Sequence, residues 1–99
     1  MKYHFEWNHN KAIRNKQKHK ISFQRAATVF RDPNMISIFD DEHSETEDRW
    51  ITLGIDENGI LLVISHTFYK MSASQCNIRI ISAHKAAKTE TTQYEELTL

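Results

Sequence analysis

The start of the chain alternates aromatic with polar residues over positions 3–7, and this two-residue period predicts a short strand with one buried face. Asn8 is a good N-cap, because its side chain can accept a hydrogen bond from a free backbone N–H, so a helix is expected over residues 9–19. This helix is unusually polar. One of its faces gathers four polar residues, Lys11, Asn15, Lys18 and His19. Such a face either contacts a partner or is simply solvated.

A second helix is predicted after Ser22, which is a further N-cap residue. Apolar residues then recur at positions i, i+3, i+4 and i+7, namely Phe23, Ala26, Ala27 and Phe30. This is the pattern of a helix that packs one face on a sheet. Residues 32–34, Asp-Pro-Asn, end the helix, since proline lacks a backbone donor and disfavours helix in the residue before it.

The rest of the chain contains short apolar runs that predict strands. We expect strands over residues 35–39, 49–54, 60–64 and 77–82, separated by an acidic loop at 40–48, an Asn-Gly hairpin turn at 57–59 and a loop at 68–74. The strand at 60–64 is apolar on both faces and should be central. A final helix is expected over 84–96. The order β-α-α-β-β-β-β-α predicts an α+β fold, with helices packed against an antiparallel sheet.

The length of 99 residues suits one compact domain, and no Pro-, Gly- or Ser-rich stretch divides the chain, so a single domain is expected over residues 1–99. The lone Cys76 cannot form an internal disulfide and is expected to be a packed or half-exposed strand residue and not a nucleophile. The first residues contain no apolar run suited to a signal peptide or a membrane span. These features predict a cytoplasmic protein that does not bind a membrane.

Charge is unevenly distributed along a chain whose formal net charge is zero. Positions 1–31 set many cations against Glu6 alone: Lys2, Lys11, Arg14, Lys16, Lys18, Lys20, Arg25 and Arg31. Positions 32–58 reverse the balance, with only Arg49 against Asp32, Asp40, Asp41, Glu42, Glu45, Glu47, Asp48, Asp56 and Glu57. The neutral total argues against a general nucleic-acid coating protein, whereas the basic front could still form a local positive patch.

The histidines raise the question of a metal site; they are His4, His9, His19, His43, His66 and His84. They form no H-x-H or H-x-x-x-H pair and no second cysteine joins them, so we expect no metal and no other cofactor. Gly54 and Gly59 are the only glycines, which excludes a glycine-rich phosphate loop. The chain also lacks a G-x-S-x-G nucleophile motif.

An arginine inside an otherwise apolar strand is the most unusual feature of the sequence. Arg79 lies within the run Ile-Arg-Ile-Ile-Ser-Ala at 78–83. A guanidinium is rarely buried unless it is paired, so Arg79 either forms an internal salt bridge or binds an anionic ligand. Arg49 opens another strand, and Glu47 points the same way if that strand begins early enough. Taken singly, each of these residues favours a structural salt bridge.

Together, these residues would suit metal-free cleavage of RNA, in which the 2′-hydroxyl attacks the adjacent phosphate. The reaction needs a group that takes the 2′ proton, a group that protonates the 5′-oxygen, and fixed positive charge. Arginine suits the last role through its bidentate fork, and histidine or lysine suits the first two. Lys18 and His19 end the first helix, and His43 lies in the acidic loop before Arg49.

Blocks of residues along nearly the whole chain carry a family resemblance. They are Phe5-Glu6-Trp7-Asn8, Lys11, Asn15, Lys18-His19 and Ile21-Ser22-Phe23; then Asp41-Glu42-His43-Ser44, Glu47, Arg49-Trp50, Leu53-Gly54 and His66-Thr67; and finally Arg79-Ile80-Ile81-Ser82-Ala83, Lys85-Ala86, Glu90 and Tyr94. In this order and spacing they resemble the BrnT family of toxins from type II toxin–antitoxin modules, within the broader RelE/ParE-like group of ribonucleases.

The resemblance implies a small RelE-like toxin that acts as a metal-independent endoribonuclease, cleaves RNA and inhibits translation. Arg49 and Arg79 fall on the family's arginine positions and would bind the scissile phosphate. The expected catalytic set is His19, Arg49, Arg79, Lys18 and Glu47, in which His19 and Lys18 are the proton-transfer candidates. The expected substrate-binding set is Lys11, His43, His84, Lys85 and Tyr94.

The resemblance also implies a cognate BrnA-type antitoxin with a DNA-binding domain. That antitoxin would hold the toxin inactive in a toxin–antitoxin heterotetramer, and the toxin would contact DNA only through it. Two positions depart from the family, because Lys70 and His84 stand where relatives commonly carry arginine. Fewer arginines weaken a phosphate site, since lysine lacks the bidentate fork. The alternative is a catalytically weakened toxin-like domain that acts as an antitoxin-binding or regulatory module.

Overall fold

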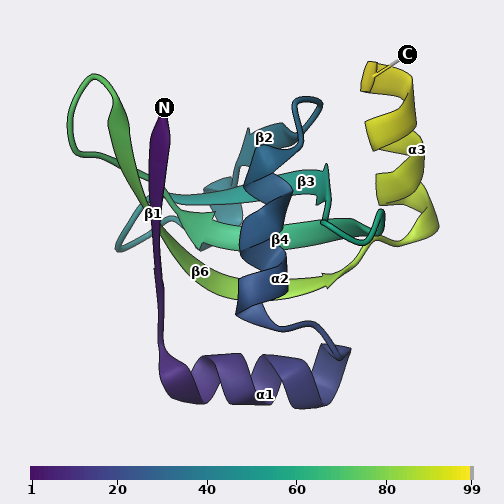
Figure 1. Ribbon diagram of the computed structural model, residues 1–99, viewed down its shortest axis with the longest axis horizontal. Coiled ribbons are helices and arrows are strands. Elements are labelled where there is room, and N and C mark those ends of the chain that lie inside the picture. The colour runs from purple at the N-terminus through teal and green to yellow at the C-terminus, as the bar shows by residue number, and fades with distance from the viewer. Residues whose placement is uncertain (99) are drawn as a thin grey trace.

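The computed structural model describes residues 1–98 and shows a mixed α+β fold (Figure 1). The elements follow in the order β1 (Lys2–Trp7), α1 (His9–His19), α2 (Phe23–Ala27), the 3₁₀ helix η1 (Thr28–Arg31), β2 (Ile36–Phe39), the 3₁₀ helix η2 (Asp41–His43), β3 (Arg49–Ile55), β4 (Leu61–Thr67), β5 (Tyr69–Lys70), β6 (Gln75–Lys85) and α3 (Lys88–Thr98). One six-stranded sheet has the order β1-β6-β4-β3-β2, with β5 also paired to β6. The predicted α+β class is confirmed, and β4 is central as expected.

The sheet is not purely antiparallel, which corrects the prediction in one place. β1 runs parallel to β6, with Tyr3 opposite Cys76 and Trp7 opposite Ile80, whereas all other pairings among residues 1–98 are antiparallel. A parallel pair needs a long crossover, here the chain through the helices and the rest of the sheet, and no local signal in the sequence sets the direction of such a pair. The short strand β5, within the predicted loop at 68–74, adds a further element to the expected order.

Local capping explains where the first two helices begin. The side chain of Asn8 accepts a hydrogen bond from the backbone N–H of Lys11 at 3.0 Å, and that of Ser22 accepts one from Arg25 at 3.1 Å. Lys20 adopts a left-handed conformation with φ of 62° and ends α1. The final helix begins at Lys88 and not at residue 84, because β6 continues to Lys85.

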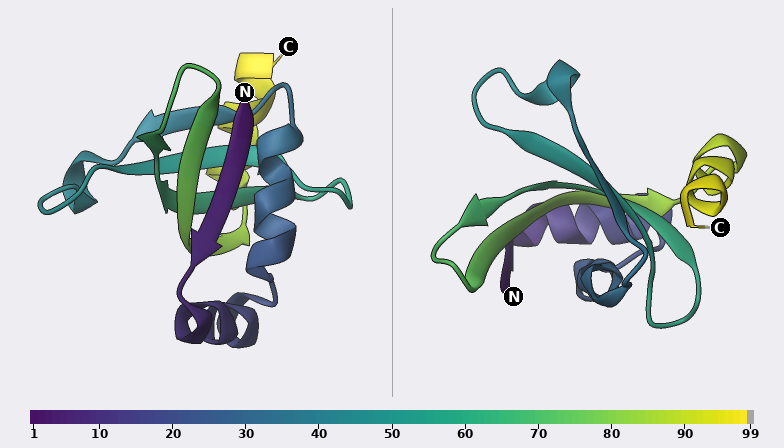
Figure 2. Two further views of the ribbon diagram at one scale, coloured as in Figure 1. Left: turned by 60° about the vertical axis from the view of Figure 1, so that its left-hand side comes forward. Right: turned by 90° about the horizontal axis from the view of Figure 1, so that it is seen from above.

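The main core lies between the sheet and the helices α1 and α2, which cover one of its faces (Figures 1 and 2). Its buried residues are Ile21, Phe23, Ala26, Val29, Phe30, Leu62, Ile64, Cys76, Ile78, Ile80 and Ala83. A smaller cluster of Leu53, Val63 and Tyr94 lies on the other face, under α3. The predicted apolar face is therefore confirmed, but the α-helix ends at Ala27, and Phe30 lies in the 3₁₀ helix η1. Figure 2 also shows that the loop containing η2 projects on the side of the sheet away from α2.

Charged and polar groups stabilise the Asn-Gly hairpin between β3 and β4. Asp56 is buried, and one of its carboxylate oxygens accepts hydrogen bonds from the backbone N–H groups of Asn58 and Ile60. Its other oxygen pairs with Arg25 of α2 at 2.5 Å. Gly59 has φ of 77°, the conformation that favours glycine in such a turn. These contacts fix the turn against α2 and hold β3 and β4 in register.

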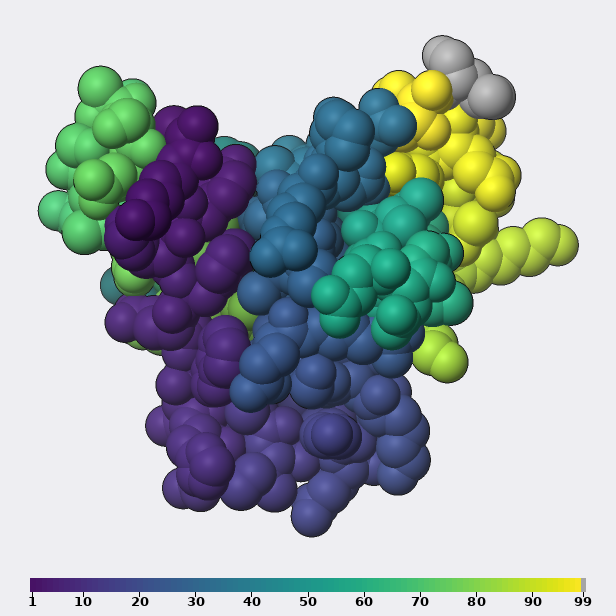
Figure 3. Space-filling view, in the orientation of Figure 1, coloured from purple at the N-terminus to yellow at the C-terminus, as the bar shows by residue number. Residues whose placement is uncertain are grey.

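An apolar pocket of about 200 Å³ lies on the α2 side of the sheet. Figure 3 shows this side of the molecule hollowed between β1 and the segment of η1. The pocket is lined by Tyr3, Phe30, Met35, Ser37, Trp50, His66 and Phe68. The hydroxyl of Thr52 lies 2.7 Å from Ser37 Oγ and 2.6 Å from His66 Nε2, so the polar groups under the pocket pair with one another. None of the predicted site residues lines it. Among the helices formed by residues 1–98, none has the length and apolar character needed to cross a bilayer.

Gly54→Ala should lower the free energy of unfolding by roughly 1–3 kcal/mol, because the added methyl group would lie 2.6 Å from Val29 Cγ1. Chemical denaturation measures this difference. In a double-mutant cycle with Val29→Ala, the two losses should be less than additive, since the smaller side chain makes room for the new methyl group. Additive losses would contradict the steric explanation.

Candidate active site

Arg49 and Arg79 lie on the two strands that flank β4, on the sheet face away from α1 and α2. Arg49 begins β3 and is paired with Thr67 of β4. The backbone N–H of Arg79 in β6 donates to the hydroxyl of the same Thr67 at 3.4 Å. Neighbouring strands are about 4.8 Å apart, so the two arginines are separated by about 10 Å at the backbone. Long side chains can meet across this distance over the short side chain of Thr67.

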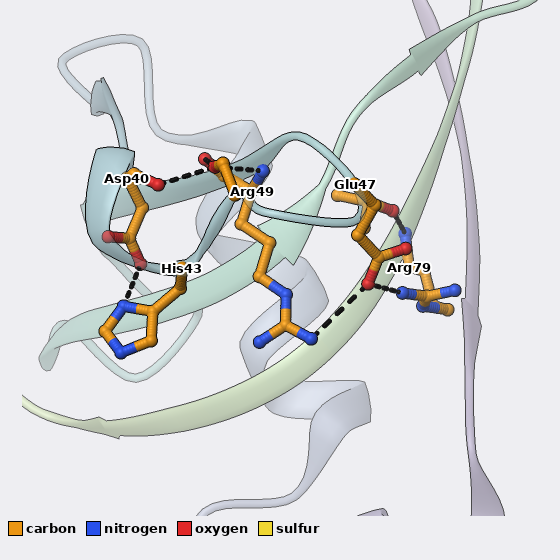
Figure 4. Close-up of polar contacts among 7 residues, drawn as sticks. Asp40, His43, Glu47, Arg49 and Arg79 are labelled. Carbon is orange, nitrogen blue, oxygen red and sulfur yellow. Dashed lines mark hydrogen bonds and ion pairs between the residues drawn. The ribbon is translucent and has the colours of Figure 1, made fainter.

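One carboxylate oxygen joins the two guanidinium groups. Glu47 Oε1 accepts a hydrogen bond from Arg49 Nη2 at 3.4 Å and a shorter one from Arg79 Nη2. Figure 4 shows the two side chains approaching this carboxylate from different sides. The exposed fractions of the side chains are 29% for Arg49, 40% for Arg79 and 33% for Glu47. The arginine in the apolar strand thus forms an ion pair, yet one that solvent and ligands can reach.

The arginines lower the pKa of Glu47 below its ordinary value. The hydrogen bond from Arg79 is the largest cause; burial opposes it, and the charges of Arg79 and Arg49 add to it. Glu47 is therefore ionised at neutral pH. This carboxylate offsets part of the repulsion between two cations that would otherwise be held close together.

The arginine pair keeps donors that Glu47 does not use. A guanidinium carries five N–H donors, and Glu47 accepts one bond from each arginine. Arg49 Nε is buried and has no hydrogen-bond partner within residues 1–98. An unsatisfied buried donor costs about 1–3 kcal/mol. The pair is therefore not a saturated salt bridge. The buried Nε is out of a ligand's reach, but both arginine side chains are partly exposed, so their other N–H groups can bind an anion such as phosphate through charge-assisted hydrogen bonds.

The loop that carries Glu47 is tied to the start of β3. Ser44 Oγ accepts a hydrogen bond from the backbone N–H of Arg49 at 3.0 Å and donates one to the carbonyl oxygen of Asp40 at 2.5 Å. Asp40 also pairs through its carboxylate with His43 Nδ1 at 2.9 Å. Figure 4 shows the exposed His43 ring and the Arg49 side chain extending to the same side. The sequence did not predict a site role for Asp40, or for Ser44 beyond its place in the family resemblance, although an Asp and a His three residues apart in the loop were a visible signal.

A second cluster of predicted residues forms where the end of α1 meets the end of β6. The rings of His19 and His84 lie 5.7 Å apart, and His84 Nε2 lies 3.9 Å from a carboxylate oxygen of Glu90. The pKa of His19 is lowered by burial, then by the nearby charges of His84 and Lys18. Lys85 is exposed next to His84. His19 and His84 are therefore close enough for the charge of one ring to affect the protonation of the other.

Asn15 holds this cluster in place. Its buried amide donates to the carbonyl oxygens of Ala83 at 2.8 Å and Ile21 at 3.0 Å, and it accepts a hydrogen bond from the N–H of Ala83 at 3.1 Å. The amide of Asn15 both donates to and accepts from the backbone of Ala83. It therefore pairs with the edge of β6 beyond the point where β1 ends. His19 follows one turn later on the same face of α1 and so reaches His84. The sequence showed Asn15 on this polar face but did not show that it is buried.

The structure does not bring the two clusters into contact. Arg79 and His84 are five positions apart along β6, a span of about 16 Å for an extended strand. A β-bulge lies between them, at the register shift opposite Ser65 and His66, and it places both side chains on the same face of the sheet. Lys11, near the start of α1, is exposed. Any ligand that touches both clusters must therefore extend along β6.

Tyr94 lies apart from both clusters. Its hydroxyl donates to Asp32 Oδ2 at 2.6 Å, and its ring packs with Leu53 and Val63 under α3. Burial, with the hydrogen bond to Asp32, raises the pKa of Tyr94 to about 12. The structure thus gives Tyr94 a packing contact between α3 and the segment after η1, away from the arginine pair.

Neither cluster is arranged as a metal centre. Within the part of the chain that the structure describes, no group of three or more His, Cys, Asp or Glu side chains is placed to hold a metal ion. Cys76 is buried in the main core, and burial raises the pKa of its thiol. It is a packed strand residue, as expected.

These features define a small α+β protein with an accessible arginine pair on one face of its sheet. A family model described as the ribonuclease toxin BrnT of type II toxin–antitoxin systems matches residues 7–90, and the chain belongs to this family. The match spans Glu47, both arginines and the two histidines of the second cluster, and it ends before Tyr94. No curated protein matches the chain. Family membership indicates a ribonuclease toxin and implies an antitoxin partner.

Glu47→Gln should remove a pH-dependent contribution to stability of a few tenths to about 1 kcal/mol. Because the pKa of Glu47 is lowered in the folded protein, its contribution is present in full above about pH 5 and is lost as the pH falls through the folded value. Unfolding free energies measured from pH 7 to pH 3 should therefore converge for the variant and the unmodified protein.

Glu45→Gln is the matched control, since it removes the same charge from an exposed position two residues away. The free energy of unfolding of this control should differ from that of the unmodified protein by the same amount at every pH. A Glu47→Gln curve that stays parallel as well would show that the ion pair with the arginines does not contribute to stability.

Proposed function

We propose that this chain is a metal-independent endoribonuclease that cleaves RNA in the cytoplasm by attack of a 2′-hydroxyl on the adjacent phosphate, and thereby inhibits translation. The observation that carries the proposal is the pair of arginines, from separate strands, joined at Glu47 on an accessible face. Two bidentate forks with unused donors suit a phosphate whose charge spreads over several oxygens during the reaction. Membership of the BrnT ribonuclease toxin family supports RNA as the substrate. A RelE-like fold remains part of the proposal.

In this proposal, Arg49 and Arg79 bind the scissile phosphate and stabilise the transition state. Glu47 is ionised and lies between them, so we assign it the 2′ proton, although the same arginines that lower its pKa make it a weaker base. His43 is the best-placed proton donor to the 5′-oxygen: Asp40 holds Nδ1, which leaves Nε2 to exchange a proton.

The second cluster takes a different part in this proposal. His19 lies against His84, which is about 16 Å along β6 from Arg79 at the backbone, so we place His19 and Lys18 away from the phosphate that the arginines bind. We propose that they contact a neighbouring part of the RNA together with His84, Lys85 and, at the far end of α1, Lys11. Tyr94 acts by packing α3.

The antitoxin proposed for this toxin is of the BrnA type, with a DNA-binding domain, in a toxin–antitoxin heterotetramer. It would neutralise the toxin by covering the arginine face, because one surface cannot bind RNA and the antitoxin at the same time. The lower number of arginines relative to the family supports a weaker variant of this activity, and the cleavage assay below decides between a nuclease and a purely antitoxin-binding module.

Arg49→Ala or Arg79→Ala should reduce RNA cleavage by about 100-fold or more, because each removes charge from the transition state. The assay incubates purified protein with RNA in chelator and looks for cyclic-phosphate ends. Arg31→Ala, an exposed arginine of η1 on the opposite side, should leave cleavage unchanged. Arg49 and Arg79 variants that retain full activity would overturn the site, and an inactive unmodified protein that still binds its antitoxin would favour the regulatory module.

His43→Ala should lower the rate at saturating RNA by about 100-fold, the size of a general acid's contribution. His19→Ala should instead raise KM while the saturating rate changes little, since we place it against flanking RNA. A saturating rate that falls with His19→Ala and survives His43→Ala would reverse these two assignments.

A further inference from the structure

We infer that Glu47 selects the ligands of the arginine pair by their charge, so that the site accepts the singly charged internal phosphodiester and disfavours the doubly charged terminal phosphomonoester. The inference rests on the proposed function, because it names the class of phosphate that the same site binds. It assigns to Glu47 a role in specificity that is separate from proton transfer.

The charges in contact at the site support this selection. Arg49 and Arg79 contribute two positive charges, and Glu47 contributes one negative charge through the oxygen that both arginines share. The net charge of one is neutralised by a single phosphodiester. A second negative charge on the ligand would lie close to Glu47, and at a half-solvated site this repulsion corresponds to roughly tenfold in affinity.

Other carboxylates around the arginines are directed elsewhere. Glu6 lies opposite Arg79 in the register of β1 and β6, but its carboxylate accepts a hydrogen bond from Asn77 at 3.1 Å. Asp40 is paired with His43. Among residues 1–98, Glu47 is the carboxylate that forms ion pairs with these two arginines.

Glu47 is also held at the site by its loop. Ser44, three residues before Glu47 in the chain, ties the loop to the backbone of Arg49, and the carboxylate itself is held by its ion pairs with the two arginines. A ligand that enters through the unused donors of the two guanidinium groups therefore meets Glu47 in place. This distinguishes a charge filter from a carboxylate that simply leaves when phosphate arrives.

Selection by charge would distinguish phosphates inside an RNA chain from those at its ends. Phosphates inside an RNA chain carry one charge each, whereas a terminal phosphate carries close to two at neutral pH. The cyclic phosphate formed by 2′-attack carries one charge, and its hydrolysis to a monoester adds the second. The site would thus act on internal linkages and would not be occupied by chain ends or by the hydrolysed product.

Binding of two matched ligands tests the inference without any cleavage. The probes are a 2′-deoxynucleoside 3′-phosphate, which is doubly charged at pH 8, and its methyl ester, which is singly charged; neither has a 2′-hydroxyl. NMR titration gives both dissociation constants for the unmodified protein, Glu47→Gln, Glu45→Gln and Arg79→Ala. The measured quantity is the ratio of the two constants for each protein.

Glu47→Gln should shift the ratio toward the doubly charged ligand by about tenfold, the effect expected for one unit charge at this distance. Glu45→Gln, the matched control, should leave the ratio as it is in the unmodified protein. A Glu47→Gln variant that binds both ligands more tightly by the same factor would show that Glu47 only competes with phosphate, and an unchanged ratio would likewise overturn the filter.

The arginine variant separates this inference from the proposed function. Arg79→Ala should weaken both ligands; if it weakens neither, or if no protein binds either ligand, the phosphate site itself is wrong. A second arm at pH 5 uses the ligand as its own control, because the second pKa of a phosphomonoester is about 6 and the two ligands then carry similar charge. At pH 5 the ratio of the two dissociation constants should be nearly the same for the unmodified protein and for Glu47→Gln. A difference in this ratio that persists at pH 5 would contradict selection by charge.

Discussion

A single carboxylate between two guanidinium groups is the interaction on which the functional face of this protein depends. Two cations held near each other repel, and the repulsion grows as water is excluded. Glu47 reduces this repulsion by accepting a hydrogen bond from each arginine, and the arginines in turn lower the pKa of Glu47 and keep it ionised. The result is a site whose charge is partly balanced in the resting protein and whose arginine side chains are partly exposed to a ligand.

The fold provides this arrangement through the sheet and not through a cavity. β3, β4 and β6 are adjacent, so Arg49, Thr67 and Arg79 form a row across three strands. The buried contact of Gly54 with Val29 lets η1 pack closely on β3, which supports the row from the opposite face. On the same strand β6, a bulge and the amide of Asn15 place a second basic cluster further along. An extended ligand could therefore follow β6 from one cluster to the other.

Much of the fold follows from local signals in the sequence. Asn8 and Ser22 mark the helix starts, and the Asn-Gly pair marks the hairpin, because each effect acts within a few residues. The parallel pairing of β1 with β6 and the start of α3 depend on contacts between distant segments, which no local pattern encodes. For the same reason the sequence could suggest that Glu47 and Arg49 point the same way, but it could not bring Arg79 to them.

The position of His84 could not be predicted from local sequence patterns. Strict alternation from Arg79 would place a residue five positions later on the opposite face, and only the bulge in β6 reverses this. Tyr94 shows the opposite case: it belongs to the family resemblance, yet its contacts with Asp32 and the cluster under α3 give it a packing role. Residue type and order identified the arginines, whereas their partners required the three-dimensional fold.

If Arg49 and Arg79 hold one phosphate jointly, a double-mutant cycle on binding of a 2′-deoxy oligonucleotide will show that their contributions are coupled. Dissociation constants would be measured for the unmodified protein, Arg49→Ala, Arg79→Ala and the double variant. A shared phosphate predicts losses that are clearly less than additive, with a coupling free energy above about 0.5 kcal/mol, because either truncation disrupts the same contact. Fully additive losses would show that the two arginines act on separate groups and do not share a phosphate.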